Sequence, residues 1–176
     1  NAYNVAIGHQ AGVLVTTGIK NTLIGGLAAD SLTTGERNVY VGYTSGDRGT
    51  TGDFNTGVGA ETLFFNVAGN KNTAVGESAL FSMTAATSTD THNTAVGYSA
   101  GGSVTSGIYN TLIGSLSGDA LTDADNNVAI GRAALSSDTL GSGSVAIGRN
   151  ALVAQNFTTA TTSYNVAIGD TAGAAV

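Results

Sequence analysis

The chain has 176 residues, only 10% of them charged, and it contains no proline, cysteine or tryptophan. Without cysteine, neither a disulfide framework nor a thiolate metal site can form. Six basic and twelve acidic residues give a net charge of −6, which argues against a nucleic-acid partner. No apolar run approaches the roughly 20 residues of a membrane span, so we expect no membrane insertion in this segment. Residue 1 is Asn, which indicates a processed chain or a piece of a longer protein.

A five-residue motif, Asn-[Thr/Val]-x-[Val/Ile]-Gly, recurs along the whole chain, with serine in place of Asn in one copy. Seven of the nine intervals between copies are seventeen residues long, as from Asn4 to Asn21, and the other two are twenty-one residues long. A fixed period this short predicts stacked coils. We therefore expect a single all-β domain over residues 1–176, a parallel β-solenoid of ten coils with seventeen or twenty-one residues each. The ten copies begin and end at Asn4 and Gly8, Asn21 and Gly25, Asn38 and Gly42, Asn55 and Gly59, Asn72 and Gly76, Asn93 and Gly97, Asn110 and Gly114, Asn127 and Gly131, Ser144 and Gly148, and Asn165 and Gly169.

The motif predicts a short strand in every coil. If the motif Asn is phase 0 of its coil, phases 1 and 3 hold only Val, Ile or Thr, and phase 4 is always Gly. β-branched residues two apart define one face of a strand, here about five residues long and ending at a glycine turn. Phase 2 is uncharged in every coil, which is typical of a strand buried on both faces. In a thin coil of two sheets, we expect phases 1 and 3 to fill each chain's core and phase 2 to pack against other chains at the axis of an oligomer.

Phases 8 and 11 share the task of supplying one large apolar side chain per coil, as expected for a thin, close-packed interior. The coil with Gly46 and Gly49 fits this rule at neither phase. Four coils have leucine at phase 8, namely Leu63, Leu80, Leu135 and Leu152, and at phase 11 they carry Asn66, Met83, Asp138 and Gln155. Where phase 8 is Gly or Ala, phase 11 is usually aliphatic, as in Val15, Leu32, Val104, Leu121 and Val176.

The two longer coils carry insertions at residues 84–92 and 156–164, which are rich in Thr and Ser and predict protruding loops. With strands about 4.8 Å apart, ten coils make a rod roughly 45 to 50 Å long with a loop about every 19 Å. These loops are our candidates for contact with a host-surface glycan or protein. The candidate residues are Thr84, Ser88, Asp90, His92, Asn156, Phe157, Thr158 and Tyr164.

The motif is similar to repeats of known fibrous proteins. Asn4–Gly8 (NVAIG) and Gly143–Gly148 (GSVAIG) resemble the N-S-V-A-I-G-x-x-S/A repeat of trimeric autotransporter adhesin heads. Asn72–Leu80 (NTAVGESAL) and Asn93–Gly101 (NTAVGYSAG) resemble the N-T-A-[IV]-G-x-x-A-G repeat of some bacteriophage tail-fibre proteins. The resemblance covers almost the whole chain. It implies a left-handed parallel β-roll, a homotrimer with the motif strands facing the three-fold axis, and an extracellular or virion-borne fibre that contacts a host surface.

Other residue patterns have structural interpretations that we favour over functional ones. The Asn column is expected to be a hydrogen-bond ladder between neighbouring coils. Asp119, Asp123 and Asp125 lack the glycine and distal glutamate of a calcium loop and predict an acidic turn. We expect no metal site, cofactor or catalytic group, because no nucleophile and base share a turn. Phase 16 could bind sugars or anionic polymers, but we favour a solvated edge that discourages aggregation. Its cations and aromatics are Tyr3, Lys20, Arg37, Phe54, Lys71, His92, Tyr109 and Tyr164.

The leading hypothesis is therefore a non-enzymatic, structural and adhesive segment of a phage tail fibre or bacterial adhesin. The first alternative is a self-assembling extracellular filament subunit whose ends stack on those of its neighbours. A further alternative is an ice-binding solenoid, suggested by the threonines at phase 12. Only three coils extend that column to two adjacent threonines, and adjacent strand residues point to opposite faces, so the array is expected to be too narrow.

Overall fold

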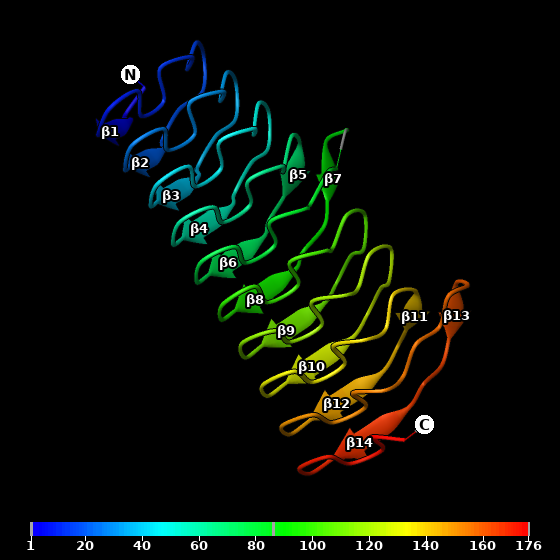
Figure 1. Cartoon of the computed structure of the whole chain (residues 1–176). Helices are drawn as coiled ribbons and strands as arrows, with labels where there is room; N and C mark the ends of the chain where they lie inside the picture. Colours follow the sequence, from blue (N-terminus) through cyan, green and yellow to red (C-terminus); the bar gives the residue numbers. More distant parts are fainter. Residues whose placement is uncertain (1, 86, 176) are drawn as a thin grey trace.

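The computed structural model describes residues 2–85 and 87–175, and these form a parallel β-solenoid without a helix (Figure 1). Ten three-residue strands make one sheet along one side of the rod, in the order of the coils. The predicted all-β solenoid is confirmed, with strands of three residues in place of five. The sheet consists of β1 (Val5–Ile7), β2 (Thr22–Ile24), β3 (Val39–Val41), β4 (Thr56–Val58), β6 (Thr73–Val75), β8 (Thr94–Val96), β9 (Thr111–Ile113), β10 (Val128–Ile130), β12 (Val145–Ile147) and β14 (Val166–Ile168).

The opposite side of the coils consists mainly of turns, with two short two-stranded sheets at the insertions, so the expected coil of two sheets is found only there. The turns still stack on one another through main-chain hydrogen bonds. The Gly12 N–H donates to the Ala28 carbonyl at 2.9 Å, and the Thr16 N–H donates to the Thr33 carbonyl at 2.9 Å. Turn N–H groups thus find carbonyls on the next coil, as a backbone packed against its neighbour requires.

Each coil bends back on itself at phases 4, 6 and 8, where the backbone φ is positive in all ten coils, and φ is also positive at the residue that precedes each motif. At phase 4, φ lies between 116° and 142°, a region that is essentially restricted to glycine. A Cβ on Gly25 would also lie 2.3 Å from the carbonyl oxygen of Gly42 in the next coil. The phase 4 column is glycine because consecutive backbones meet there without room for a side chain.

The strand faces are the reverse of the sequence prediction. Phase 2 points into the coil, and Leu23, Ala95 and Ala129 at this phase are 0% exposed. Phases 1 and 3 point outward, where Ile7 is 59% and Ile113 is 37% exposed. The expectation that phases 1 and 3 fill the core was therefore wrong. The interior lies between a single sheet and closely stacked turns, and it accepts one strand side chain per coil beside those of phases 8 and 11.

The interior volume of each coil is shared among phases 2, 8 and 11. A large side chain at phase 2 occupies the space next to phase 8 of its own and the preceding coil, since a Cβ on Gly12 would lie 2.5 Å from Cδ1 of Leu23 in the next coil. Within one coil, a Cβ on Gly118 would lie 2.7 Å from Leu112 Cδ2. In the coils where phase 8 is leucine, phase 2 is Gly or Ala instead. The predicted exchange between phases 8 and 11 is thus part of a three-way exchange that includes the strand.

Tyr40 explains why the coil with Gly46 and Gly49 has no large apolar side chain at phase 8 or phase 11. Its ring is buried at phase 2 with 1% exposure, and a Cβ on Gly46 would lie 2.7 Å from the ring carbons Cε1 and Cζ. A Cβ on Gly57, at phase 2 of the next coil, would lie 3.0 Å from Tyr40 Cδ1. Burial raises the pKa of the Tyr40 hydroxyl well above its usual value. Gly46 and Gly49 are small because the tyrosine fills the space that larger residues occupy in other coils.

The motif Asn side chains form the ladder that the sequence predicts. Asn21 Oδ1 accepts a hydrogen bond from the Asn38 main-chain N–H at 2.9 Å, and Asn21 Nδ2 donates to the Gly35 carbonyl at 2.9 Å. Equivalent bonds from main-chain N–H to Asn Oδ1 continue without a break to the N–H of Ser144. Six of these amides therefore tie their coil both to its own turn and to the next coil, namely Asn21, Asn38, Asn55, Asn93, Asn110 and Asn127. The seven ladder residues from Asn21 to Asn127 are at most 1% exposed, which is compatible with burial because their polar atoms are bonded.

A different polar network replaces the ladder where serine replaces Asn. Gln155 Nε2 donates to Ser144 Oγ at 3.0 Å and to a carboxylate oxygen of Asp138 at 2.5 Å. Asn165 Nδ2 donates to Gln155 Oε1 at 2.8 Å. The polar side chains of Asp138 and Gln155, both at phase 11, thus bond the last coils together, which the sequence pattern alone did not indicate.

Each insertion adds a two-residue strand that pairs with the preceding coil. β5 (Gly69–Asn70) pairs with β7 (Thr89–Asp90), and β11 (Gly141–Ser142) pairs with β13 (Thr161–Thr162). Figure 1 shows both pairs on the side away from the motif sheet, where the chain reaches beyond the neighbouring turns. Residue 86 of the first predicted loop and Val176 of the phase 11 set lie outside the described residues.

The three-way exchange predicts how Tyr40 and Gly46 are coupled. Tyr40→Ala should destabilise the protein by about 3–5 kcal/mol, because it leaves a ring-sized cavity. Gly46→Leu alone should also destabilise it, because the leucine and the ring compete for one space. The double variant Tyr40→Ala/Gly46→Leu recreates the combination of Ala74 and Leu80 and should be more stable than either single variant. Thermal unfolding followed by circular dichroism measures this cycle, and additive losses would contradict it.

Candidate functional site

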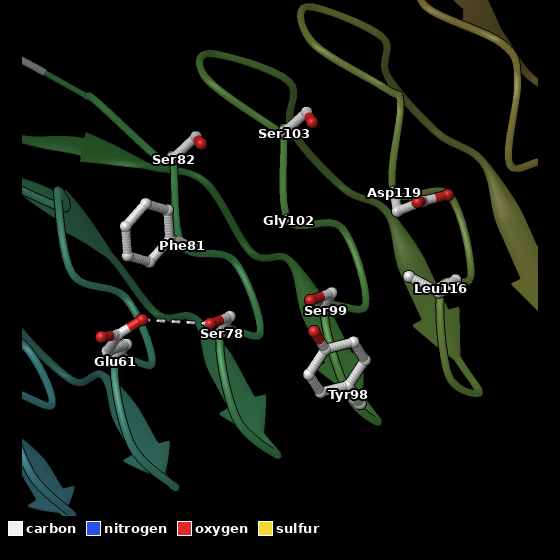
Figure 2. A pocket seen from close by; sticks show the side chains of 10 residues that line it. All are labelled: Glu61, Ser78, Phe81, Ser82, Tyr98, Ser99, Gly102, Ser103, Leu116 and Asp119. Carbon is white, nitrogen blue, oxygen red and sulfur yellow. Dashed lines mark hydrogen bonds between the residues drawn. The ribbon is translucent and has the colours of Figure 1, made fainter.

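A groove of about 470 Å³ crosses the turns that follow β4, β6, β8 and β9 (Figure 2). It opens where three small residues coincide, namely Ser78 and Ser99 at phase 6 and Gly102 at phase 9. The neighbouring coils carry larger residues at the same phases. These are Glu61 and Leu116 at phase 6, and Phe81 and Asp119 at phase 9.

The groove combines aromatic, hydroxyl and carboxylate groups. Figure 2 shows the rings of Phe81 and Tyr98 on either side of the Ser78 and Ser99 hydroxyls, with Glu61 at one end. Tyr98 is 54% exposed, so much of its ring is available to a ligand. Ser78 Oγ donates to Glu61 Oε2 at 3.3 Å. None of the residues that line the groove is basic.

The Phe81 ring is held in place by a small aromatic cluster beside the groove. Phe64 stacks on Phe81 with ring centroids 5.2 Å apart, and Phe65 meets Phe81 edge to face at 5.2 Å. The Arg48 guanidinium lies over the Phe64 ring, 5.8 Å from its centroid. These contacts reduce the freedom of Phe81, so the aromatic wall of the groove is preorganised.

Asp119 forms the far edge of the groove without offering its carboxylate to the centre. Figure 2 shows its carboxylate directed away from Tyr98. Its Oδ1 is buried and has no hydrogen-bond partner among the described residues. Burial raises the pKa of this carboxyl, and a hydrogen bond from its own backbone opposes the shift.

The predicted acidic turn around Asp119 does not form one cluster. Ser106 Oγ donates to Asp123 Oδ1 at 2.6 Å, and the Ile108 N–H donates to Asp125 Oδ1 at 2.8 Å. The two aspartates therefore bond to the preceding coil, while Asp119 lines the groove. Across residues 2–85 and 87–175, no group of three or more His, Asp or Glu side chains could hold a metal ion.

The predicted contact residues of the insertions are exposed, except that Phe157 is half-buried. In the first insertion, Lys71 Nζ donates to Asp90 Oδ2, and the His92 ring stacks on Tyr109 with centroids 5.4 Å apart. The Lys71 ammonium is the main reason that the pKa of Asp90 lies below its usual value. The coils of β8 to β12 separate the two insertions, and no described residue of either insertion lines the groove.

Several side chains of the phase 16 column are engaged in contacts within the chain. The Arg37 guanidinium lies over the Phe54 ring at 5.0 Å, and Lys71 pairs with Asp90. Backbone φ is positive at each of these positions of the column, so it marks the corner where one coil passes into the next. These contacts favour the structural interpretation of the column over a polymer-binding one.

The sequence did not predict the groove. Its residues come from phases 5, 6, 9 and 10 of four different coils, and none of these phases has a constant residue type within the repeat. One signal was present, because Gly102 interrupts a phase 9 column that has phenylalanine in the two preceding coils. Finding the groove from that signal required knowing that phase 9 points outward beside phase 6.

No family model, no curated protein and no solved structure matches this chain. The likeness to adhesin and tail-fibre repeats therefore remains a resemblance of motifs. Within the part of the chain that the structure describes, no helix is long and apolar enough to cross a membrane.

An acidic pair in the phase 9 column gives a pH-dependent stability. Burial raises the pKa of Asp47 to about 6, hydrogen bonding and repulsion from Asp30 add to the effect, and Arg48 opposes it. Because the folded state binds this proton more tightly than the unfolded state, its contribution is present at low pH and is lost as pH rises from about 4 to about 6.

Asp47→Asn should therefore raise the melting temperature at pH 7 relative to the parent chain and have little effect at pH 4. Thermal unfolding at both pH values measures the difference. Asp90→Asn is the control, because the pKa of the exposed Asp90 is lowered and not raised, so its replacement should not raise the melting temperature at pH 7. An Asp47→Asn variant with an unchanged melting temperature at pH 7 would contradict the assignment.

Proposed function

We propose that this chain is a non-enzymatic segment of an extracellular or virion-borne fibre, such as a phage tail fibre or a bacterial adhesin. In this proposal three copies form a stiff, left-handed rod that presents surface features to a host. The observation that carries the proposal is the outward face of the ten-stranded sheet. Its side chains, at phases 1 and 3, are all Val, Ile or Thr, and none is charged.

This face is unusual for the surface of a separate chain. Sheets made only of parallel strands are normally covered on both faces, and isolated soluble proteins rarely expose a long continuous apolar surface. Val39, Val58, Val96 and Ile113 in the middle of the sheet are 36% to 38% exposed. Covering them would remove this apolar area from water, which favours association.

A second copy of the same chain is the partner that fits best. The strands pair in register from Val5 with Thr22 to Ile147 with Ile168, so the apolar stripe has the length of the rod. An equal stripe on each copy gives a closed, symmetric interface. A stripe only three residues wide suits three rods around one axis, which is also what the motif resemblance implies. Phases 1 and 3 then face the axis, in place of phase 2, which the sequence suggested.

The two insertions are the proposed contacts with the host surface. They project from the side away from the motif sheet, so assembly through that sheet leaves them accessible (Figure 1). Most of their exposed side chains carry hydroxyls, as Tyr164 does, and the carboxylate of Asp90 and the imidazole of His92 are exposed beside them. Such surfaces recognise polar partners such as glycans through hydrogen bonds.

Ice binding is a second candidate, and one observation favours it. On the outward face, Thr22, Thr56, Thr73, Thr94 and Thr111 each stand two residues from a Val or Ile, in rows about 4.8 Å apart. A regular array of hydroxyl and methyl groups is what an ice-binding surface requires. The phase 12 threonines fit less well, because hydroxyls such as that of Thr33 donate to the next coil. Strong thermal hysteresis by a monomeric chain would favour ice binding over the fibre.

End-to-end stacking into filaments is the alternative assembly. Electron microscopy of the purified chain separates the two. Rods of one fixed length support the fibre segment, whereas filaments of indefinite length support polymerisation.

Self-association should depend on the outward sheet face. Light scattering coupled to size exclusion should give three times the mass of the chain, and Val96→Glu/Ile113→Glu should reduce it to that of a single chain. The reason is that the variant places carboxylates against one another in an apolar interface. Thr17→Glu/Thr34→Glu adds the same charge at exposed turn positions and should leave the mass unchanged. A stable monomer of the parent chain would contradict the proposal.

Host contact should depend on the exposed side chains of the insertions. Replacing Ser88, Asp90, Thr158 and Tyr164 with Ala should lower binding to arrayed bacterial surface polysaccharides at least several-fold. The melting temperature should change little, because these side chains lie outside the core and exposed ion pairs such as Lys71 with Asp90 contribute little to stability. Unchanged binding to every polysaccharide that the parent chain recognises would refute the assignment of the insertions.

A further inference from the structure

We propose that the groove between Glu61 and Asp119 binds a saccharide ring without an acidic group, either a neutral hexose or a hexosamine. This inference deepens the proposed function, since it rests on a role at a host surface and names the class of ligand. It places recognition on the coils themselves, at a site separate from both insertions.

The aromatic walls suit the apolar face of a sugar. A pyranose presents C–H groups on one face, and an exposed aromatic ring packs against them in the same way as against other apolar surface. Tyr98 offers such a ring at 54% exposure, and Phe81 offers a second that is fixed by its contacts with Phe64 and Phe65. Little side-chain freedom is lost at Phe81 on binding, which favours affinity.

The polar groups suit the hydroxyls of a sugar. The Glu61 carboxylate has several acceptor sites and receives one hydrogen bond, from Ser78, so it can accept others from a ligand. Ser82, Ser99 and Ser103 line the groove with hydroxyls that both donate and accept. A carboxylate without a neighbouring cation in the groove disfavours uronic acids, sialic acids and sugar phosphates, and it favours an amino sugar.

The size of the groove suits a short segment of a glycan. It spans the turns of four coils, which is about 14 Å along the rod at the spacing of parallel strands. Its volume of about 470 Å³ has room for more than one sugar ring. Gly102 keeps the middle open, because phase 9 elsewhere carries side chains such as those of Phe64 and Val153.

Saturation-transfer NMR with methyl β-glucopyranoside, glucosamine and glucuronate tests the proposal on the assembled protein. The first two probes should bind and glucuronate should bind more weakly. Tyr98→Ala should weaken binding about 3- to 10-fold, the usual value of one aromatic contact. Tyr43→Ala is the matched control, since Tyr43 occupies the same phase in another coil and is 59% exposed.

Gly102→Leu tests the groove by filling it without removing any lining group. The position has no positive φ, and an added Cβ would lie 3.3 Å from the nearest atom, the Ser99 carbonyl oxygen, so the fold needs only a small adjustment. Binding should be abolished. The control variant Ser136→Leu changes a residue at the same phase but outside the groove, and it should still bind the sugar. Retained binding in Gly102→Leu, or loss of binding in both leucine variants alike, would overturn the site.

Two further outcomes would overturn the saccharide assignment. One is a complete absence of saturable binding by all three sugars. The other is binding of ethanolamine as tight as that of glucosamine without binding of methyl glucoside, which would indicate a simple ammonium site. The mass of the same samples by light scattering is independent of these results. A trimer that binds no sugar refutes the groove alone, and a monomer that binds sugar refutes the fibre assembly alone.

Discussion

The direct stacking of each coil on the next is the constraint on which the rest of the structure depends. Consecutive backbones approach so closely that a Cβ at the phase 4 glycine would meet the next coil's carbonyl oxygen, at 2.3 Å for Gly25. The same proximity lets buried Asn21 and Asn38 bond both to their own turns and to the neighbouring coil. Because every coil must present the same donors and acceptors at the same height, the spacing of the motif is fixed, and extra residues are accepted only at residues 84–92 and 156–164.

Close stacking also makes the interior thin, and this decides which side chains point where. One sheet and one layer of turns leave space for a fixed volume per coil. Leu23, Tyr40 or Leu112 can use that space from the strand only where the adjacent residue at phase 8 is Gly or Ala. No space is left for the β-branched residues of phases 1 and 3, which therefore form the outer face. The same packing rule that fills the core thus produces the apolar surface on which the proposed assembly rests.

The remaining surface can vary because it takes little part in the stacking. Phases 5, 6, 9 and 10 differ from coil to coil, and their side chains can create a groove, an aromatic cluster or an acidic pair without disturbing the backbone. Ser78, Ser99 and Gly102 leave a hollow beside Phe81 and Tyr98, whereas Asp30 and Asp47 stack in the same column and raise the pKa of Asp47. Specific features therefore occur as local departures from the repeat, on a rod whose shape is set by the residues that do repeat.

The sequence by itself determined the number of coils, the parallel strand at each motif, the Asn ladder and the exposed insertions. Each of these follows from local chemistry that recurs with the period, such as the backbone conformation that glycine permits or the paired donors and acceptors of an amide. Only the tertiary structure decided which strand face is buried, why Tyr40 stands among Gly46, Gly49 and Gly57, and where the groove lies. Those features depend on the space between residues that are one or more coils apart, and an alternating pattern such as Val5, Ala6 and Ile7 is compatible with either face pointing inward until the thickness of the interior is known.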